Sequence, residues 1–573
     1  MTEKLTVISE RVDDIPLLVA QQKRMGVQPL LDEHFPTHGN WLGISLGWVA
    51  MVWLTHIISR ADHRLNHAQP WAAKRLETLR GCSGQPVRAL DFSDDRLGDV
   101  LYALSDDERW DAFESGLNQR LLRVYDLSTE QIRLDSTTVS GYWHVTLDGL
   151  FQLGHSKGRR PDLPQVKVML ATLDPLGMPV ATDVLSGNQA DDPLYIPSIT
   201  RVGESLGRRG LLYVGDCKMG ALKTRAFVQA GGDFYLCPLS ETQLPPETLE
   251  AYLALVWTGE QALTSVYRKK ASGEQELIAE GYERLETLTA VVEGETITWT
   301  ERRLVVRSLK HAQAAERALR KRLAKAQVAL AALNERRRGK KRFREVEPLR
   351  QAAEAILEQY RVQGLLELSY QEIVNERPVR GYRERPATVR VEREVRVNAM
   401  VDKAALEMVV RRLGWRVYAT NQPGEQLSLT HTVLAYRSQY IVERGFGRLK
   451  GRPLSVTPMY LQRDDHATGL IRLLSIGLRV LTLLEFEVRR RLEAEETALA
   501  GLYAGNPKRA TARPTVERLL ESFQEITLTI IQEPHQIRRH LTPLSELQVR
   551  ILALLDFPLN IYTGLCANSF KPP

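Results

Sequence analysis

Cysteine is scarce in this sequence, and its few copies are isolated. The 573 residues include only Cys82, Cys217, Cys237 and Cys566, and no two of them form a C-x-x-C pair. This spacing argues against a disulfide framework and against a structural zinc site. The histidines also lack H-x₃-H spacing. A reducing cytosol is therefore the expected location.

Targeting signals and repeats are also missing. The opening MTEKLTVISERVDDIP carries acids where a signal peptide needs a basic region followed by an apolar run, so no secretory address is expected. No internal repeat or low-complexity tract is found. The uncharged run from Trp41 to Ser59 is about long enough to cross a bilayer. It stands alone between polar helical segments, so a buried helix and no membrane partner are expected.

Length and charge favour a large protein with a polyanionic partner. At about 150 residues per domain, the chain is long enough for roughly three or four units. Lysine and arginine outnumber aspartate and glutamate 77 to 70, and the pI is about 9.1. The excess is small, so its placement along the chain matters more than its size.

The hydrophobic pattern divides the chain into five segments of a multidomain α/β protein. Residues 1–128 show helical spacing and form a candidate DNA-binding domain, with Asp106 as a helix cap. Residues 129–240 alternate short β-branched runs with helices, as expected for a mixed sheet covered by helices. Residues 241–400 are expected to be an α+β insertion, with strand-like runs over 253–305 and a long helical hairpin. Residues 401–485 return to the main sheet through WRVYATN, and residues 486–573 form a helical C-terminal region suited to dimerisation.

Three carboxylates are candidates for catalysis. The strand period of QIRLDSTT places Asp135 on the face opposite Leu134. Asp216 ends the apolar run LLYVGD, at the edge where open α/β sheets usually bind ligands. Glu443 lies on a predicted helix, in a stripe with Tyr436, Gln439, Tyr440, Gly447 and Lys450. Three acids brought together repel one another unless divalent cations neutralise them.

The segment around Glu443 resembles a known family. In YRSQYIVERGFGRLK, Tyr436 precedes Glu443 by seven residues and Lys450 follows it by seven. These intervals resemble the Tyr/Arg/Glu/Lys signature of a large group of bacterial insertion-sequence transposases. LDSTTVSGYW and LYVGDCKMG resemble the blocks around that group's first and second Asp, and GNQADD its Gly-Asn-x-x-Asp turn. The similarity covers residues 130–240 and 405–485.

The resemblance implies an RNase H-like catalytic core interrupted between Asp216 and Glu443 by the insertion. It also implies a cut-and-paste DDE transposase that binds the terminal inverted repeats of a mobile element, cuts them and joins them to target DNA as a homodimer. Asp135, Asp216 and Glu443 take the catalytic and metal-binding roles, with two Mg²⁺ ions that Mn²⁺ can replace. Tyr436 and Lys450 take contacts to phosphates of double-stranded DNA.

Further residues are candidates for DNA binding. The family arginine is replaced by Gln439, an amide that can still donate a hydrogen bond to a phosphate. Two basic patches, around residues 155–160 and 336–342, could hold the DNA backbone in a salt-sensitive way or could simply be solvated surface. The complete set of side chains expected to contact DNA is Tyr436, Gln439, Arg444, Arg448, Lys450, Lys157, Arg159, Arg160, Arg336, Arg337, Arg338, Lys340 and Lys341.

Two other functions remain open at this point. One is a related metal-dependent nuclease or a domesticated, non-mobile DNA-binding protein. The other is a glycoside hydrolase with paired carboxylates, which would need no metal. Metal dependence of the reaction separates the hydrolase from the transposase.

Overall fold

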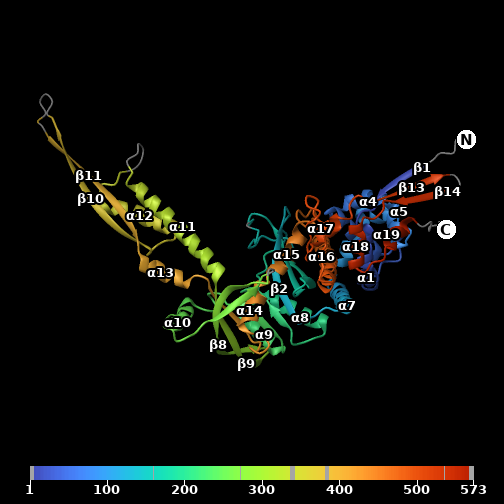
Figure 1. The fold of residues 1–573 in the computed structure, drawn as a ribbon, viewed down its shortest axis with the longest axis horizontal. Coiled ribbons are helices and arrows are strands. Elements are labelled where there is room, and N and C mark those ends of the chain that lie inside the picture. Colours follow the sequence, from blue (N-terminus) through green and yellow to red (C-terminus); the bar gives the residue numbers. More distant parts are fainter. Residues whose placement is uncertain are drawn as a thin grey trace.

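A computed structural model of the chain describes residues 6–566, apart from 159, 271–272, 336–341, 381–385, 387 and 534–535. The molecule is elongated (Figure 1). A large body carries both ends of the chain at one side, and an arm projects from the opposite side. The basic run from Arg336 to Lys341, namely Arg336, Arg337, Arg338, Lys340 and Lys341, lies outside the described residues, as does Arg159.

The N-terminal segment is helical, as its spacing predicted. Its helices are α1 (Ile15–Met25), α2 (Val27–His34), α3 (Leu46–Arg60), α4 (Leu65–Ala73), α5 (Leu76–Ser83), η1 (Ala89–Phe92), α6 (Asp94–Leu104) and α7 (Asp107–Tyr125). The Asp106 side chain caps α7 by accepting from the Arg109 amide. The membrane-like run forms α3, in which every residue from Leu46 to Ile58 is buried. It is therefore a core helix of the body.

The C-terminal segment packs on the N-terminal one and includes strands that the helical prediction missed. Its elements are α16 (Asp464–Ala494), α17 (Val516–Glu521), β13 (Thr527–Glu533), β14 (Gln536–Leu541), α18 (Glu546–Leu554), α19 (Asn560–Thr563) and η3 (Gly564–Cys566). β13 pairs with β14 and, antiparallel, with β1 (Thr6–Arg11). Among the described residues, α16 alone is long and apolar enough to cross a membrane, but its most apolar stretch is 94% buried in the body.

A mixed sheet of nine strands forms the centre of the body. Its order is β4 (Met178–Ser186), β3 (Gln165–Leu173), β2 (Gln131–Ser140), β5 (Leu212–Val214), β6 (Phe234–Pro238), β12 (Trp415–Thr420), β9 (Glu295–Ser308), β8 (Gln275–Val292) and β7 (Thr264–Lys269). β2, β3 and β4 are antiparallel, whereas β5 runs parallel to β2 and β6 parallel to β5. Helix α8 (Tyr195–Leu206) leads from β4 into β5, and α9 (Leu222–Ala230) connects β5 with β6. β12 pairs with β6, so WRVYATN does return to the main sheet.

Residues 241–400 do not leave the sheet as one block. They begin with a helix, α10 (Pro246–Trp257), where strand-like alternation was expected from residue 253. β7, β8 and β9 then extend the main sheet through pairing of β9 with β12. Only the following stretch departs from the body: α11 (Leu309–Leu333), α12 (Val346–Tyr360), β10 (Leu366–Val379), β11 (Thr388–Val401) and α13 (Lys403–Arg412). We call this stretch the arm.

The helical segment that contains Glu443 is broken. A single helix was expected from Tyr436 to Lys450, but α14 (Leu429–Arg437) ends and α15 (Tyr440–Lys450) begins on either side of Ser438 and Gln439. The expected stripe of side chains on one continuous helix is therefore wrong. The break has a tertiary cause, because a buried arginine from β2 binds the chain there.

Candidate active site

The sheet brings Asp135 and Asp216 close together. In the parallel pairing of β2 with β5, Arg133 lies opposite Val214. Asp135 follows two residues later on β2, and Asp216 follows two residues after the end of β5, so the register sets the two acids next to each other. Asp135 is flanked on its other side by Leu170 of β3.

Two hydrogen bonds orient the Asp216 carboxylate. The Tyr195 hydroxyl donates to Asp216 Oδ1 at 2.7 Å, and the Lys218 amide donates to the same oxygen at 2.8 Å. Tyr195 lies in α8 and is only 2% exposed. Burial and the neighbouring Asp216 raise the pKa of Tyr195, so its hydroxyl remains a donor. The second acid is thus held by a fixed donor from a helix that covers the sheet.

Glu443 reaches the site from α15, which Arg133 anchors to β2. The fully buried Arg133 guanidinium donates to the Ala435 carbonyl at 2.6 Å and to Gln439 Oε1 at 3.5 Å. It also forms an ion pair with Asp174 at 2.8 Å. Glu443 is exposed in the first turn of α15. One strand therefore carries the first acid and also positions the helix of the third.

The charges of the other two acids act on Asp135. The pKa of Asp135 is raised to about 6: burial is the largest cause, the Lys157 ammonium opposes it, and the charges of Asp216 and Glu443 add to the rise. Lys157 Nζ lies 3.6 Å from Asp135 Oδ1 and donates to the Ser136 carbonyl at 2.6 Å. A cationic group thus already stands beside the first acid.

The same residues suit a divalent cation. Within the described part of the chain, no three His, Cys, Asp or Glu side chains are close enough to enclose a metal ion as they stand. The acids nevertheless supply hard oxygen donors, and the Lys157 ammonium stands where positive charge offsets the repulsion at Asp135. Asp135, Asp216 and Glu443 therefore fit a cofactor of the magnesium type.

Some of the side chains expected to contact DNA lie near the three acids, and others do not. Lys450 lies near Asp135 and Lys157, and burial together with the Lys157 charge lowers its pKa. Tyr436 and Gln439 line a cavity of about 410 Å³ together with Glu443. Arg160, in contrast, pairs with Asp162 in an exposed loop.

Arg444 and Arg448 point to a different part of the body. Both guanidinium groups bind Glu485 of α16, each with a shortest contact of 2.5 Å. Arg448 also binds Glu517 at 2.7 Å and is only 6% exposed. The expected phosphate contact is not open to Arg448 in this structure, because its guanidinium is buried in these ion pairs.

Sequence reasoning assigned no role to a fourth acid beside the site. Asp191 accepts from Ser136 Oγ at 3.0 Å and from Lys167 Nζ at 2.7 Å, and it lies 3.6 Å from Lys157 Nζ. It is the last residue of the Gly-Asn-x-x-Asp turn, and this motif is the sequence signal that could have identified it. Asp191 holds Lys157 and Ser136 in place next to Asp135.

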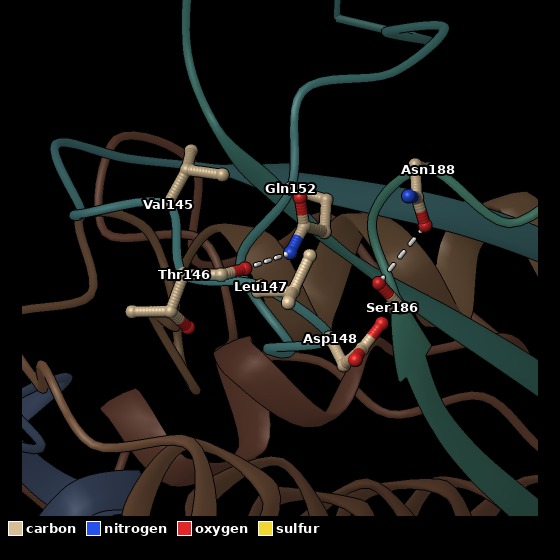
Figure 2. A pocket seen from close by; sticks show the side chains of 7 residues that line it. All are labelled: Val145, Thr146, Leu147, Asp148, Gln152, Ser186 and Asn188. Atoms are coloured by element: carbon tan, nitrogen blue, oxygen red, sulfur yellow. Dashed lines mark hydrogen bonds between the residues drawn. The ribbon is translucent and has the colours of Figure 1, made fainter.

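A hollow of about 530 Å³ lies beside this turn, under the connection between β2 and β3 (Figure 2). Gln152 Nε2 donates to the Thr146 carbonyl at 2.6 Å, and Ser186 Oγ donates to Asn188 Oδ1 at 3.0 Å. Leu147, at its rim, is 94% exposed. Asp135, Asp216 and Glu443 do not line this hollow, so it is a surface feature next to the candidate site.

Comparison with known proteins supplies the family. The family model described as "Transposase DDE domain" matches residues 128–478, which is more than half of the chain and includes all three acids. A search of curated proteins gives no match. Among solved structures, the chain matches one described as "Cryo-EM structure of piggyBac transposase synaptic complex with hairpin DNA", with 8% identity and a TM-score of 0.33, over 97% of this chain and 86% of that one. On the family match, the chain belongs to the DDE transposases.

Proposed function

We propose that this enzyme cuts the ends of a mobile element and joins them to target DNA, using Asp135, Asp216 and Glu443 as its catalytic triad. The observation that carries the proposal is the convergence of these acids, seen in the parallel register of β2 and β5 and in the raised pKa of Asp135. Membership of the DDE transposases supports the same reading and disfavours a glycoside hydrolase.

The proposed subgroup is that of bacterial insertion-sequence transposases with the Tyr/Arg/Glu/Lys signature, acting on DNA in the cytosol. The strand order β4-β3-β2-β5-β6, with three antiparallel strands followed by two parallel ones, supports an RNase H-like core. In this proposal, residues 129–240 and the part of 401–485 that follows the arm form that core, while β7, β8 and β9, which widen the sheet, and the arm make up the insertion. The terminal segments 1–128 and 486–573 would serve DNA binding and dimerisation.

The triad would hold two Mg²⁺ ions, which supply the activation of water and the stabilisation of the leaving oxygen. Tyr195 and the Lys218 amide keep the Asp216 carboxylate in one orientation. Lys157 and Lys450 add positive charge beside Asp135, where the reacting phosphate of double-stranded DNA would lie. Tyr436, Gln439 and Glu443 share a cavity suited to the adjoining backbone.

The decisive test is cleavage of labelled DNA that carries both ends of the element, with Mg²⁺ or with EDTA. Glu443→Gln should reduce nicking at the ends by roughly a thousandfold or more, because losing several kcal/mol of metal-dependent stabilisation has an effect of that order. DNA binding should persist. Glu407→Gln, an exposed change on α13 of the arm, is the matched control and should leave cleavage unchanged.

The outcomes separate the alternatives. Undiminished, Mg²⁺-dependent cleavage by Glu443→Gln would remove Glu443 from the triad. Binding without cleavage by the unmodified protein would favour a domesticated DNA-binding protein. Cleavage of any DNA without strand transfer would favour a nuclease.

A further inference from the structure

A second cavity, of about 400 Å³, lies on the other side of α15 from the acids. The turn between β3 and β4, helices α15 and α16, and the segment before α17 line it. Its lining holds five arginines but only two acids, Glu485 and Glu493. The arginines are Arg444, Arg448, Arg489, Arg490 and Arg513.

One buried carboxylate at this cavity is shared by three arginines. Glu485 is 5% exposed and binds Arg444, Arg448 and Arg489, the last at 2.8 Å. Burial lowers the pKa of Arg489, and the charges of Arg444, Arg513 and Arg448 lower it further, although Glu485 opposes this. Three guanidinium groups on one carboxylate leave an excess of positive charge.

Arg513 adds to this excess. It is exposed at the rim of the cavity, and within the described part of the chain its side chain has no hydrogen bond or ion pair. Two of the other arginines have acids of their own: Arg490 pairs with Glu487 at 2.8 Å, and Arg448 with Glu517 at 2.7 Å. Arg444 already donates to both Glu485 oxygens, and Arg489 Nε donates to the Pro514 carbonyl at 2.9 Å, so the open guanidinium of this cavity is that of Arg513.

The cavity adjoins the catalytic acids. Tyr440 lines both this cavity and the one that contains Glu443, and its side chain is 62% exposed. Glu443 and Arg444 are consecutive residues of α15 that face opposite hollows. A chain of anionic groups that crosses Tyr440 would enter both cavities in succession.

We propose that the arginine cavity binds a backbone phosphate of the DNA strand that runs over Tyr440 from the catalytic acids. Guanidinium groups match phosphate oxygens with two parallel hydrogen bonds, which suits the exposed Arg513, while Arg444 and Arg489 add positive charge beside it. The buried Glu485 keeps these groups in place and cannot neutralise all of them. This site deepens the proposed function and rests on it, because it fixes the path of the DNA beyond the reacting phosphate.

The test measures binding of a duplex carrying the element end as a function of KCl concentration. Arg513→Ala should weaken binding several-fold at low salt and reduce the slope of log K against log[salt] by about one, the change expected when one phosphate contact is lost. Arg509→Ala is the matched control. Arg509 lies on the same segment and stacks over Tyr503 at 4.2 Å, outside the cavity.

A second measurement locates the contact on the DNA. Neutral methylphosphonates replace single backbone phosphates near the cleavage position. One of them should weaken binding of the unmodified protein and of Arg509→Ala, yet have no further effect on Arg513→Ala. Equal unfolding temperatures of the two variants would show that folding is unaffected.

The cavity assignment would be overturned if Arg513→Ala and Arg509→Ala had the same salt slope and no methylphosphonate position were specific to Arg513. Normal cleavage at the element ends would still uphold the proposed function in that case. If the unmodified protein bound no duplex at any salt concentration, both proposals would fall.

Discussion

The body and the arm are stabilised in different ways. One continuous apolar cluster runs through the body, from Val12 near one end of the chain to Leu565 near the other. The arm has a separate, smaller cluster, formed by residues between Leu319 and Leu406 of α11, α12, β10, β11 and α13. The body therefore depends on contacts between distant parts of the chain, whereas the arm depends on local ones.

The two regions also differ in where they place charge. In the body, Glu114 of α7 is buried between Arg479 of α16, at 2.6 Å, and Arg201 of α8, at 2.7 Å. In the arm, the pair of Glu316 and Arg320 lies on the surface of α11. Buried ion pairs therefore link the layers of the body, whereas exposed ion pairs of the arm contribute little to its stability.

The largest expected effect sharpens this comparison. Glu114→Gln should destabilise the body by about 3–5 kcal/mol, because it leaves the fully buried Arg479 without its charged partner. Glu316→Gln in the arm is the control and should cost about 0.5 kcal/mol or less. Residues 309–413 contain no tryptophan, so in denaturant unfolding tryptophan fluorescence follows the body, and circular dichroism, to which the arm's helices contribute, is needed to follow the arm. Equal costs for the two changes would contradict the contrast.

A smaller effect concerns the pH dependence of the body's stability through Asp135, one of the proposed catalytic acids. The folded pKa of Asp135, about 6, exceeds its usual 3.8, so ionisation costs folding free energy. This contribution is favourable below about pH 4 and is lost as the pH rises through 6. Bound Mg²⁺ should reverse the loss, with a limit of about 2–3 kcal/mol. Mg²⁺ should therefore raise the unfolding temperature more at pH 8 than at pH 5.

The control for this measurement is Asp135→Asn, which should abolish the pH dependence of the Mg²⁺ effect. An Mg²⁺ effect that is equal at pH 5 and pH 8 in the unmodified protein would show that Asp135 does not titrate with metal binding.

The smallest expected effect tests whether the arm is separable. The Ser308 amide donates to the Gly414 carbonyl at 2.9 Å, so the two ends of the arm meet at its root. Replacing residues 309–413 by an Asn-Gly turn should join β9 to β12 as a hairpin. The tryptophan-detected unfolding temperature should change by no more than a few degrees. Loss of cooperative unfolding would show that the body needs the arm.

The sequence by itself determined the local elements of the catalytic region. The β-branched runs predicted β2, β3, β4 and β6, and the apolar run before Asp216 predicted β5. The two aspartates could be placed because strand period and strand ends are local properties. The polar strand β10 was missed, because most of its side chains are exposed and carry no apolar pattern.

Only the tertiary structure decided how the segments combine. The pairing of β1 with β13 joins opposite ends of the chain, and β7, β8 and β9 extend the main sheet where a separate insertion was expected. The helix break before Glu443 depends on Arg133, which lies 302 positions before its partner Ala435. Arg448 was expected to contact DNA, but its guanidinium is buried in ion pairs with Glu485 and Glu517. A guanidinium has the same chemistry in every location, so its partner is set by which surfaces long-range packing brings together.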